Sequence, residues 1–175
     1  MSLQRVLLFG ICCVAIVDRP TAFGETLSQR TKCHNVRAKL VVVRVSANCS
    51  SPVDFCSAGT IAGGGIVNGA LAGNVLGLAP GAGLPGLVPS STLSFVAVHT
   101  IETARGILTM LGTGVFDTAR GEFAEIDPVT SGTGVFQGAT GTLWLTGTSS
   151  DGGVSFAGDV IGQVCVARSR QTEDK

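Results

Sequence analysis

The sequence is poor in several residue types that common protein functions require. Among its 175 residues there are no tyrosines, one tryptophan and two histidines, and only 14% of the residues are charged. Basic and acidic residues balance at twelve each, and no basic cluster is present that could follow a phosphate backbone. Aromatic side chains are too scarce for stacking on bases. The composition therefore argues against nucleic-acid binding.

The sequence also lacks a leading apolar run of membrane-spanning length. The run from Val6 to Val17 follows Arg5 and ends at Asp18, whereas a spanning helix needs about 20 residues. A basic start, a short apolar stretch and a polar exit ending at Gly24 are the three parts of a secretory signal. The sequence predicts a signal peptide at residues 1–24 and a secreted protein, extracellular or periplasmic.

Formal charge is absent from Phe55 to Ile101, and two interpretations are open. One is a pair of Gly-rich strands, near 59–65 and 68–78, followed by a Pro/Gly loop at 79–89. The other is a membrane helix, because glycine recurs every fourth residue between 65 and 81, a spacing that lets helices pack in lipid. Strands are favoured because glycine is a poor helix former and Pro80 interrupts the segment. No membrane association is predicted.

Four cysteines remain after removal of the signal peptide: Cys33, Cys49, Cys56 and Cys165. An even number in an exported chain predicts disulfides, and four cysteines allow three connectivities. The short spacing favours Cys49 with Cys56 as a local pair, which would leave Cys33 and Cys165 to join the first strand region to the last. The spacing fits no compact zinc pattern, so no metal is predicted.

Short β-favouring segments separated by Gly, Asp and Ser turns occupy the rest of the chain. They cover residues 39–45, 92–103, 107–116, 123–127, 141–148 and 154–167. Such regular spacing is typical of an all-β sandwich or barrel. We expect an N-terminal extension at 25–38, a β domain at 39–167 and a disordered C-terminal tail at 168–175.

Two decapeptides, Gly112–Gly121 and Gly132–Gly141, share seven of ten positions. Two copies are too few for a solenoid. We therefore expect two strand edges that use the same glycine-permitted bend, with Val and Phe packed inward.

The second decapeptide with its flanks, Thr130–Leu143, resembles the Gly-rich strand of the allene oxide cyclase-like barrel family, whose superfamily includes the dirigent proteins. The segment Cys49–Gly59 is similar to one in exported bacterial relatives. The resemblance implies a closed antiparallel β-barrel of about eight strands around an apolar cavity, often assembled as a homotrimer. Family cyclases draw on a tyrosine, and no catalytic residue carries over to a chain that has none.

The glycines of this block also have a physical rationale. Gly132, Gly134, Gly138 and Gly141 can adopt positive φ or allow close backbone approach. We expect them to let the strand bulge and turn a barrel corner. Closing the barrel removes the exposed edges that Val-rich strands would otherwise present.

The candidate chemical residues follow from strand alternation. If Phe95 and Ile101 share the inner face of a strand, His99 lies there too and Glu102 lies on the opposite face. An imidazole or carboxyl in a desolvated lumen titrates nearer neutrality and can act as a general acid or base. His99, or Glu102 if the faces are reversed, is the candidate catalytic residue. Phe95 and Trp144 are the candidate ligand-lining residues.

The remaining charges favour a simpler interpretation. Those around the turn after residue 116 are Asp117, Arg120, Glu122 and Glu125. We predict them to be solvated or paired at the surface. A calcium site at Glu122, Glu125 and Asp127 is an alternative, but no EF-hand-like loop supports it.

These observations predict a secreted β-barrel that binds a small apolar molecule without a cofactor, as a cyclase, an isomerase or a dirigent-like guide. The alternative is a non-catalytic structural or interaction protein of the cell envelope or exterior, with a filled barrel. A cavity with His99 or Glu102 on its wall would favour the ligand-binding function. A lumen packed with Val, Leu and Phe would favour the structural role.

Overall fold

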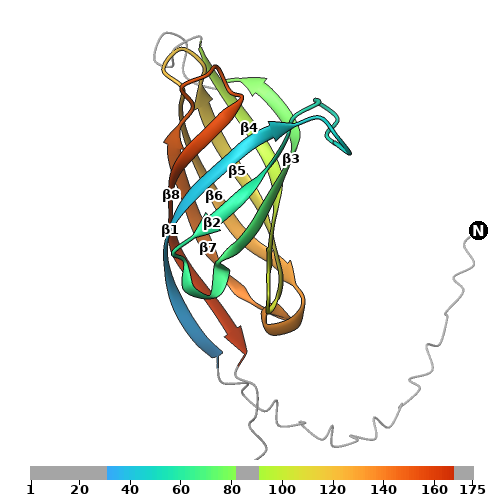
Figure 1. Ribbon diagram of the computed structural model, residues 1–175, viewed down its shortest axis with the longest axis vertical. Coiled ribbons are helices and arrows are strands. Elements are labelled where there is room, and N and C mark those ends of the chain that lie inside the picture. The colour runs from blue at the N-terminus through green and yellow to red at the C-terminus, as the bar shows by residue number, and fades with distance from the viewer. Residues whose placement is uncertain (1–30, 82–90, 168–175) are drawn as a thin grey trace, which may run out of the picture.

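The computed structural model describes residues 31–81 and 91–167, which form a closed antiparallel barrel of eight strands (Figure 1). The strands are β1 (Thr31–Val45), β2 (Cys56–Ala62), β3 (Gly69–Pro80), β4 (Thr92–Thr103), β5 (Gly106–Asp117), β6 (Glu122–Gly132), β7 (Thr140–Thr148) and β8 (Ser155–Ala167). Each strand pairs with its neighbours in the chain, and β1 pairs with β8 to close the barrel. The predicted fold class, an all-β closed barrel, is confirmed.

Alternation along the strands separates an interior from an outer face. On β1, Val36, Leu40 and Val42 are buried, whereas Val41 and Val43 are 56% and 47% exposed. Successive strand residues point to opposite faces, so an unbroken Val run necessarily places apolar side chains on both. The outside of the barrel therefore carries aliphatic residues as well as polar ones.

The membrane-helix interpretation of the charge-free segment is wrong. Its first part forms β2 and β3, which pair with each other from Cys56–Asn74 to Ile61–Gly69, and its last part belongs to β4. No helix within the described ranges is long and apolar enough to cross a membrane. Strand β3 continues to Pro80, and most of the predicted Pro/Gly loop lies outside the described residues.

The barrel starts earlier than the sequence predicts. We expected an extension at residues 25–38, but β1 begins at Thr31 and pairs with β8 from that residue onward. Residues 31–38 therefore belong to the barrel, because their partner strand β8 extends equally far in the opposite direction. The predicted signal peptide and C-terminal tail lie outside the described residues.

The two decapeptides do not adopt the same structure, which corrects a second prediction. In the first, Val115 and Phe116 belong to β5, and Val115 points outward. In the second, Val135 and Phe136 lie in a 3-10 turn, η2 (Gly134–Phe136), between β6 and β7. Gly134, the first residue of this turn, and Gly138, just after it, have positive φ values of 59° and 68°, which are strained for any residue with a Cβ. The two decapeptides differ because the Val-Phe pair of the second lies in the turn that closes one end of the barrel, whereas that of the first lies within a strand.

The remaining structural glycines serve close approach. Gly141 has φ of 138°, and a Cβ there would overlap the carbonyl of Gln163 on β8. A Cβ at Gly132 would meet Phe136. Gly132, Gly134 and Gly141 thus stand where the backbone passes close to another element, whereas Gly138 has open space around it and is required only for its positive φ.

Phe136 is part of a packed core at one end of the barrel. A second 3-10 turn, η1 (Gly65–Val67), connects β2 with β3 at the same end as η2, the lower end in Figure 1. Val67 and Phe136 are fully buried, together with Ile101, Leu108 and Met110 of the neighbouring strands. The lumen at this end is filled by side chains.

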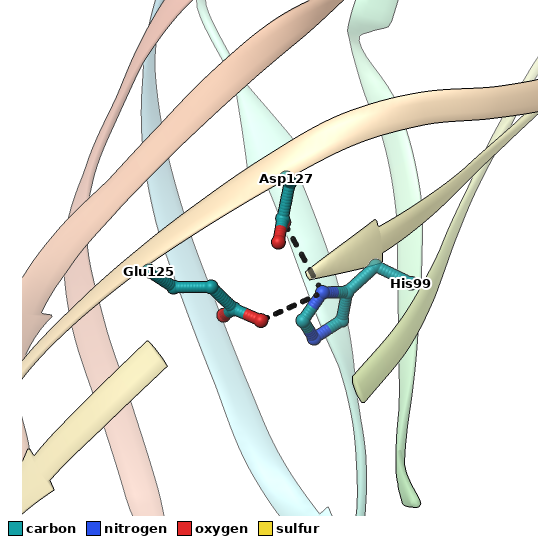
Figure 2. A group of neighbouring side chains, drawn as sticks. All are labelled: His99, Glu125 and Asp127. Atoms are coloured by element: carbon teal, nitrogen blue, oxygen red, sulfur yellow. Dashed lines mark hydrogen bonds and ion pairs between the residues drawn. The ribbon is translucent and has the colours of Figure 1, made fainter. Parts of the chain in front are cut away.

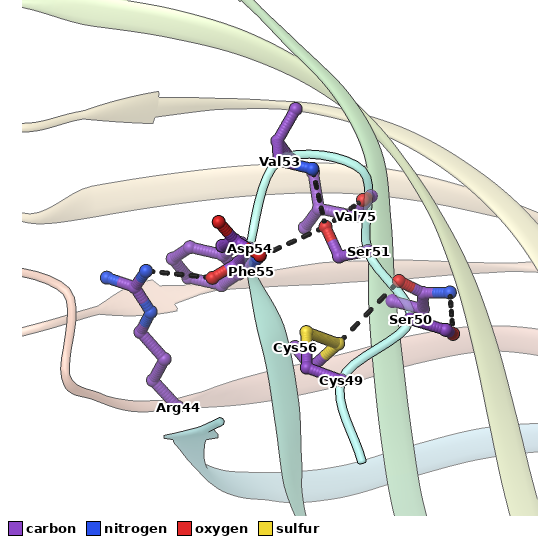
Figure 3. Close-up of a disulfide and its surroundings, with 10 residues drawn as sticks. Arg44, Cys49, Ser50, Ser51, Val53, Asp54, Phe55, Cys56 and Val75 are labelled. Carbon is purple, nitrogen blue, oxygen red and sulfur yellow. Dashed lines mark hydrogen bonds between the residues drawn. A yellow bond between two sulfur atoms is a disulfide. The ribbon is translucent and has the colours of Figure 1, made fainter. Parts of the chain in front are cut away.

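In the part of the chain that the structure describes, two disulfides join the four cysteines. Cys33–Cys165 links β1 to β8 at a directly paired position, and Cys49–Cys56 ties the β1–β2 loop to the start of β2 (Figure 3). In the same loop the Ser51 hydroxyl accepts hydrogen bonds from the backbone N–H groups of Val53 and Phe55. It donates one to the Val75 carbonyl of β3. The loop is thereby fixed against the barrel with Phe55 facing the lumen.

Candidate functional site

The end of the barrel opposite η1 and η2 contains a cavity of about 270 Å³. Five phenylalanines from different parts of the chain contribute to its wall: Phe55, Phe95, Phe116, Phe123 and Phe156. Phe156 makes edge-on contacts with three of the others, at centroid distances of 5.6–6.1 Å. The exposed residues Arg44 and Thr118 also border the cavity, so it reaches the surface beside the β1–β2 loop and the β5–β6 turn.

The cavity wall is mostly apolar; besides Arg44, Ser57 and Thr118, its polar residues are two members of a buried polar cluster formed by His99, Glu125 and Asp127 (Figure 2). The imidazole Nδ1 of His99 lies 3.2 Å from Asp127 Oδ2 and 3.4 Å from Glu125 Oε1. The three side chains are 9%, 0% and 5% exposed for His99, Asp127 and Glu125. His99 and Glu125 line the cavity, whereas Asp127 is not part of its wall.

Strand alternation and two glycines bring these side chains together. His99 is on β4, Glu125 and Asp127 are on β6, and β5 runs between the two strands. A Cβ at Gly112 of β5 would overlap both Asp127 Oδ1 and Glu125 Oε1. On the other side of His99, a Cβ at Gly73 would press on the imidazole ring and on the Ser57 hydroxyl. The cluster exists because both flanking strands lack a side chain at this level.

Burial and mutual charge shift the titration of the cluster. Burial lowers the pKa of His99, but the hydrogen bond to Asp127 and the charges of Glu125 and Asp127 outweigh it and leave the pKa raised. Burial is the largest cause that raises the pKa of Glu125, to about 8; the nearby His99 lowers it and Asp127 raises it. The His99 shift reflects the two neighbouring carboxyl groups, and the Glu125 shift reflects mainly burial, which disfavours the ionised carboxylate.

Two oxygens of the cluster have no hydrogen-bond partner in the described part of the chain. They are Glu125 Oε1, whose 3.4 Å contact with His99 Nδ1 is an ion pair and not a hydrogen bond, and Asp127 Oδ1; both atoms are fully shielded from solvent. Leaving a buried acceptor unpaired costs about 1–3 kcal/mol, and native proteins contain few such atoms. The cluster is therefore costly to fold unless something further neutralises it.

The predicted site residues divide between the two faces of the barrel. His99 and Phe95 face the lumen and line the cavity. Glu102 is exposed on the outer face of β4, the side expected if His99 points inward. Trp144 is 45% exposed on the outer face of β7 and does not line the cavity. It is replaced there by Leu145, its neighbour on the inner face.

Sequence reasoning missed Glu125 and Asp127 as partners of His99. We expected Glu125 to be a solvated or paired surface charge, and it is buried. Arg120 and Glu122 do form the exposed ion pair expected near that turn, at 3.2 Å. The signal was the two-residue spacing of Phe123, Glu125 and Asp127, which places both carboxylates on the face of a core aromatic residue.

Chemically, the cluster can hold extra positive charge beside an apolar cavity, either as protons or as a metal ion, because its donor atoms all lie within 4.8 Å of one another. Calcium at Glu122, Glu125 and Asp127, the alternative considered from sequence, does not fit, because Glu122 points outward. Comparisons of the chain with protein-family models, with curated proteins and with solved structures found no match.

Proposed function

We propose that this protein is an exported barrel that binds a small, largely apolar molecule in its cavity, with the polar group of that molecule directed to His99 and Glu125. One observation carries the proposal: the apolar wall of the cavity ends at a buried polar cluster. Ligand sites typically combine apolar walls with a few convergent polar groups that orient the ligand.

The size of the cavity limits the ligand. A cavity of about 150 Å³ accommodates benzene, so one of about 270 Å³ suits a molecule of roughly ten to twelve non-hydrogen atoms. Phenylalanine edges around it favour a flat or cyclic molecule, since aromatic pairs gain from edge-on and offset contacts. A bicyclic aromatic or terpene-like compound with one hydroxyl or carbonyl group fits both requirements.

The structural-protein alternative accounts for only one half of the lumen. Side chains fill the end closed by Val67 and Phe136, as that alternative expects. It offers no reason for a cavity at the other end, or for placing three ionisable side chains there at the cost of unpaired oxygens.

Export is supported by two independent features. The first 24 residues have the pattern of a secretory signal, and the two disulfides are typical of proteins in oxidising compartments. The resemblance to the allene oxide cyclase-like barrel family, which led us to expect eight strands around an apolar cavity, adds to the binding proposal.

The test is calorimetric titration of the purified, disulfide-bonded protein with naphthalene and with 1-naphthol, bicyclic molecules of the proposed size. We expect saturable binding of both, and tighter binding of 1-naphthol because its hydroxyl can reach His99 or Glu125. Ala97 is buried on the cavity wall, and Ala97→Leu should weaken binding at least tenfold by filling the cavity.

Val96→Leu is the matched control, since Val96 is the neighbouring residue on the outer face. Thermal unfolding of both variants verifies that each is folded. Absence of binding by the folded wild type, or equal binding by Ala97→Leu, would overturn the proposal.

A further inference from the structure

Three side chains that can bind a metal converge in the polar cluster, from two strands that are not neighbours in the barrel. His99 supplies Nδ1, and Glu125 and Asp127 supply carboxylate oxygens, with all of these atoms within 4.8 Å of one another. Figure 2 shows both carboxylates turned toward the same imidazole nitrogen. None of the three side chains is more than 9% exposed.

The hydrogen bonds within the cluster do not satisfy all of its carboxylate oxygens. A single imidazole nitrogen carries at most one N–H, and here Nδ1 stands between two carboxylates at 3.2 and 3.4 Å. With both carboxyl groups ionised, as a bound cation requires, Glu125 Oε1 and Asp127 Oδ1 have no hydrogen-bond donor among the described residues, although their side chains are at least nine-tenths buried. An added cation would serve several of these oxygens at once, which one N–H direction cannot.

The spacing of the donor atoms fits coordination. A cation bound about 2.0–2.2 Å from each ligand holds neighbouring ligand atoms about 3.0–3.5 Å apart, and the observed separations from Nδ1 are 3.2 and 3.4 Å. A divalent cation would also balance two carboxylates beside a neutral imidazole, so that the buried site carries no net charge.

We propose that His99, Glu125 and Asp127 bind one divalent transition-metal cation, Zn²⁺ or Mn²⁺ in chemical class. This goes beyond small-molecule binding and does not depend on it, and it departs from the sequence, which predicts neither metal nor cofactor. Mixed imidazole and carboxylate ligands suit these ions, whereas Ca²⁺ and Mg²⁺ prefer oxygen ligands alone. Zn²⁺ should bind more tightly than Mn²⁺, following the general order of affinities.

Two features of the surroundings support the assignment. Because His99 and Glu125 line the cavity, a cation held by three protein ligands keeps its remaining positions open to that space, as catalytic rather than structural sites do. Gly112 leaves room beneath the two unpaired oxygens, where any Cβ would overlap both.

The experiment uses the full disulfide-bonded protein, treated with EDTA, dialysed, and titrated calorimetrically with ZnCl₂ and separately with MnCl₂. We expect one Zn²⁺ per chain and weaker Mn²⁺ binding at the same site. Glu125→Gln, Asp127→Asn and His99→Ala should each weaken Zn²⁺ binding at least 100-fold. Binding of Co²⁺ should give visible absorption bands that Zn²⁺ abolishes, a signature that needs no variant.

Matched controls separate this site from adventitious binding. His34→Ala removes the other histidine, and Glu122→Gln removes an exposed carboxylate of the same strand. Neither should change Zn²⁺ affinity. Gly112→Ala should weaken it by displacing both carboxylates, whereas Gly77→Ala, which meets nothing within 4 Å, should not.

A folded wild type that binds neither ion overturns the proposal and leaves protons as the charge that neutralises the cluster. Zn²⁺ binding that survives all three ligand variants, or that His34→Ala abolishes, overturns it as well. Failure of naphthalene and 1-naphthol to bind would leave the metal result untouched, so the two proposals fail separately.

Discussion

The two ends of the barrel interior are enclosed by the same eight strands, yet they are filled differently. At the end closed by η1 and η2, the lumen holds aliphatic side chains and the fully buried Phe136. At the other end, inward positions of the strands include Gly73 and Gly112, and the space contains a cavity and three ionisable groups. One end maximises buried apolar contact, and the other gives up contact to hold polar groups.

The two ends of the barrel differ in what they contribute to stability. Packing at the closed end contributes to the free energy of unfolding with every buried methylene. The cavity end carries unpaired buried oxygens that lower it. Proteins accept such local costs mainly at functional sites, where the rest of the structure compensates. The closed end is the part of the barrel that can compensate here.

The largest expected contrast concerns the two disulfides, one at each end. Cys33–Cys165 spans 132 residues at the closed end, and Cys49–Cys56 spans 7 beside the cavity. In the chain-entropy description, removing the long-range bridge should cost about 5 kcal/mol and removing the local one about 2.5 kcal/mol. Urea unfolding of the Cys33→Ala/Cys165→Ala and Cys49→Ala/Cys56→Ala proteins measures both.

An equal loss of stability in the two double variants would contradict this ranking. It would mean that strain in the native state, rather than loop length, sets the contribution of each bridge. The mutants should keep the far-UV spectrum of the barrel in the absence of urea if they are folded, which is the control.

The next contrast compares phenylalanines of the two ends. Phe136 is fully buried in the packed end, so Phe136→Ala should cost about 3–5 kcal/mol because it leaves a closed cavity. Phe95 lines an existing cavity and is only partly buried, so Phe95→Ala should cost about 1–2 kcal/mol. Denaturant unfolding measures the difference, and similar costs would show that the cavity end is as tightly packed as the closed end.

The sequence predicted the strands of the barrel better than it predicted how each end of the barrel is filled. The strand at 92–103 was predicted with its observed bounds, because it is a long run of β-favouring residues, and the alternation of faces along a strand placed His99 on the side of Phe95 and Ile101. Phe136 was predicted to lie on a strand edge like Phe116, because the two decapeptides have nearly the same local sequence. That sequence does not show that the second decapeptide closes one end of the barrel. Local sequence indicates where a strand runs, but not the tertiary role of a turn.

The polar cluster shows the same limit at the functional end. Glu125 and Asp127 are charged, and charge near a turn usually means solvent, so the sequence favoured a surface location. Their burial depends on Gly112 of the neighbouring strand, whose missing side chain leaves the space they occupy. Trp144 was expected inside because both faces of β7 are apolar, and only the closed barrel decides that Leu145 is the inner residue.

The smallest expected effect concerns the mouth of the cavity. There Asp151 organises the β7–β8 loop, next to Gly152 and Gly153 of the cavity wall. Its carboxylate accepts hydrogen bonds from the Ser155 hydroxyl and from the backbone N–H groups of Val154 and Ser155. The hydrogen bond from the Ser155 side chain is the largest cause that lowers the pKa of Asp151, to about 2. Such turns favour Asp because its short side chain reaches nearby backbone donors.

A carboxyl whose pKa is lower in the folded than in the unfolded chain stabilises the fold above the unfolded value, about 3.9, and loses that contribution as the pH falls toward 2. Asp151→Asn should therefore lower the Tm slightly at pH 7, and the gap to the wild type should close between about pH 4 and pH 2. Thermal unfolding followed by circular dichroism across this range measures it, with Glu122→Gln as an exposed control that leaves the neutral-pH Tm unchanged. A gap that persists undiminished at pH 2 would mean that the carboxylate charge does not hold this loop, and that the mouth of the cavity is ordered by its glycine backbone and aromatic neighbours instead.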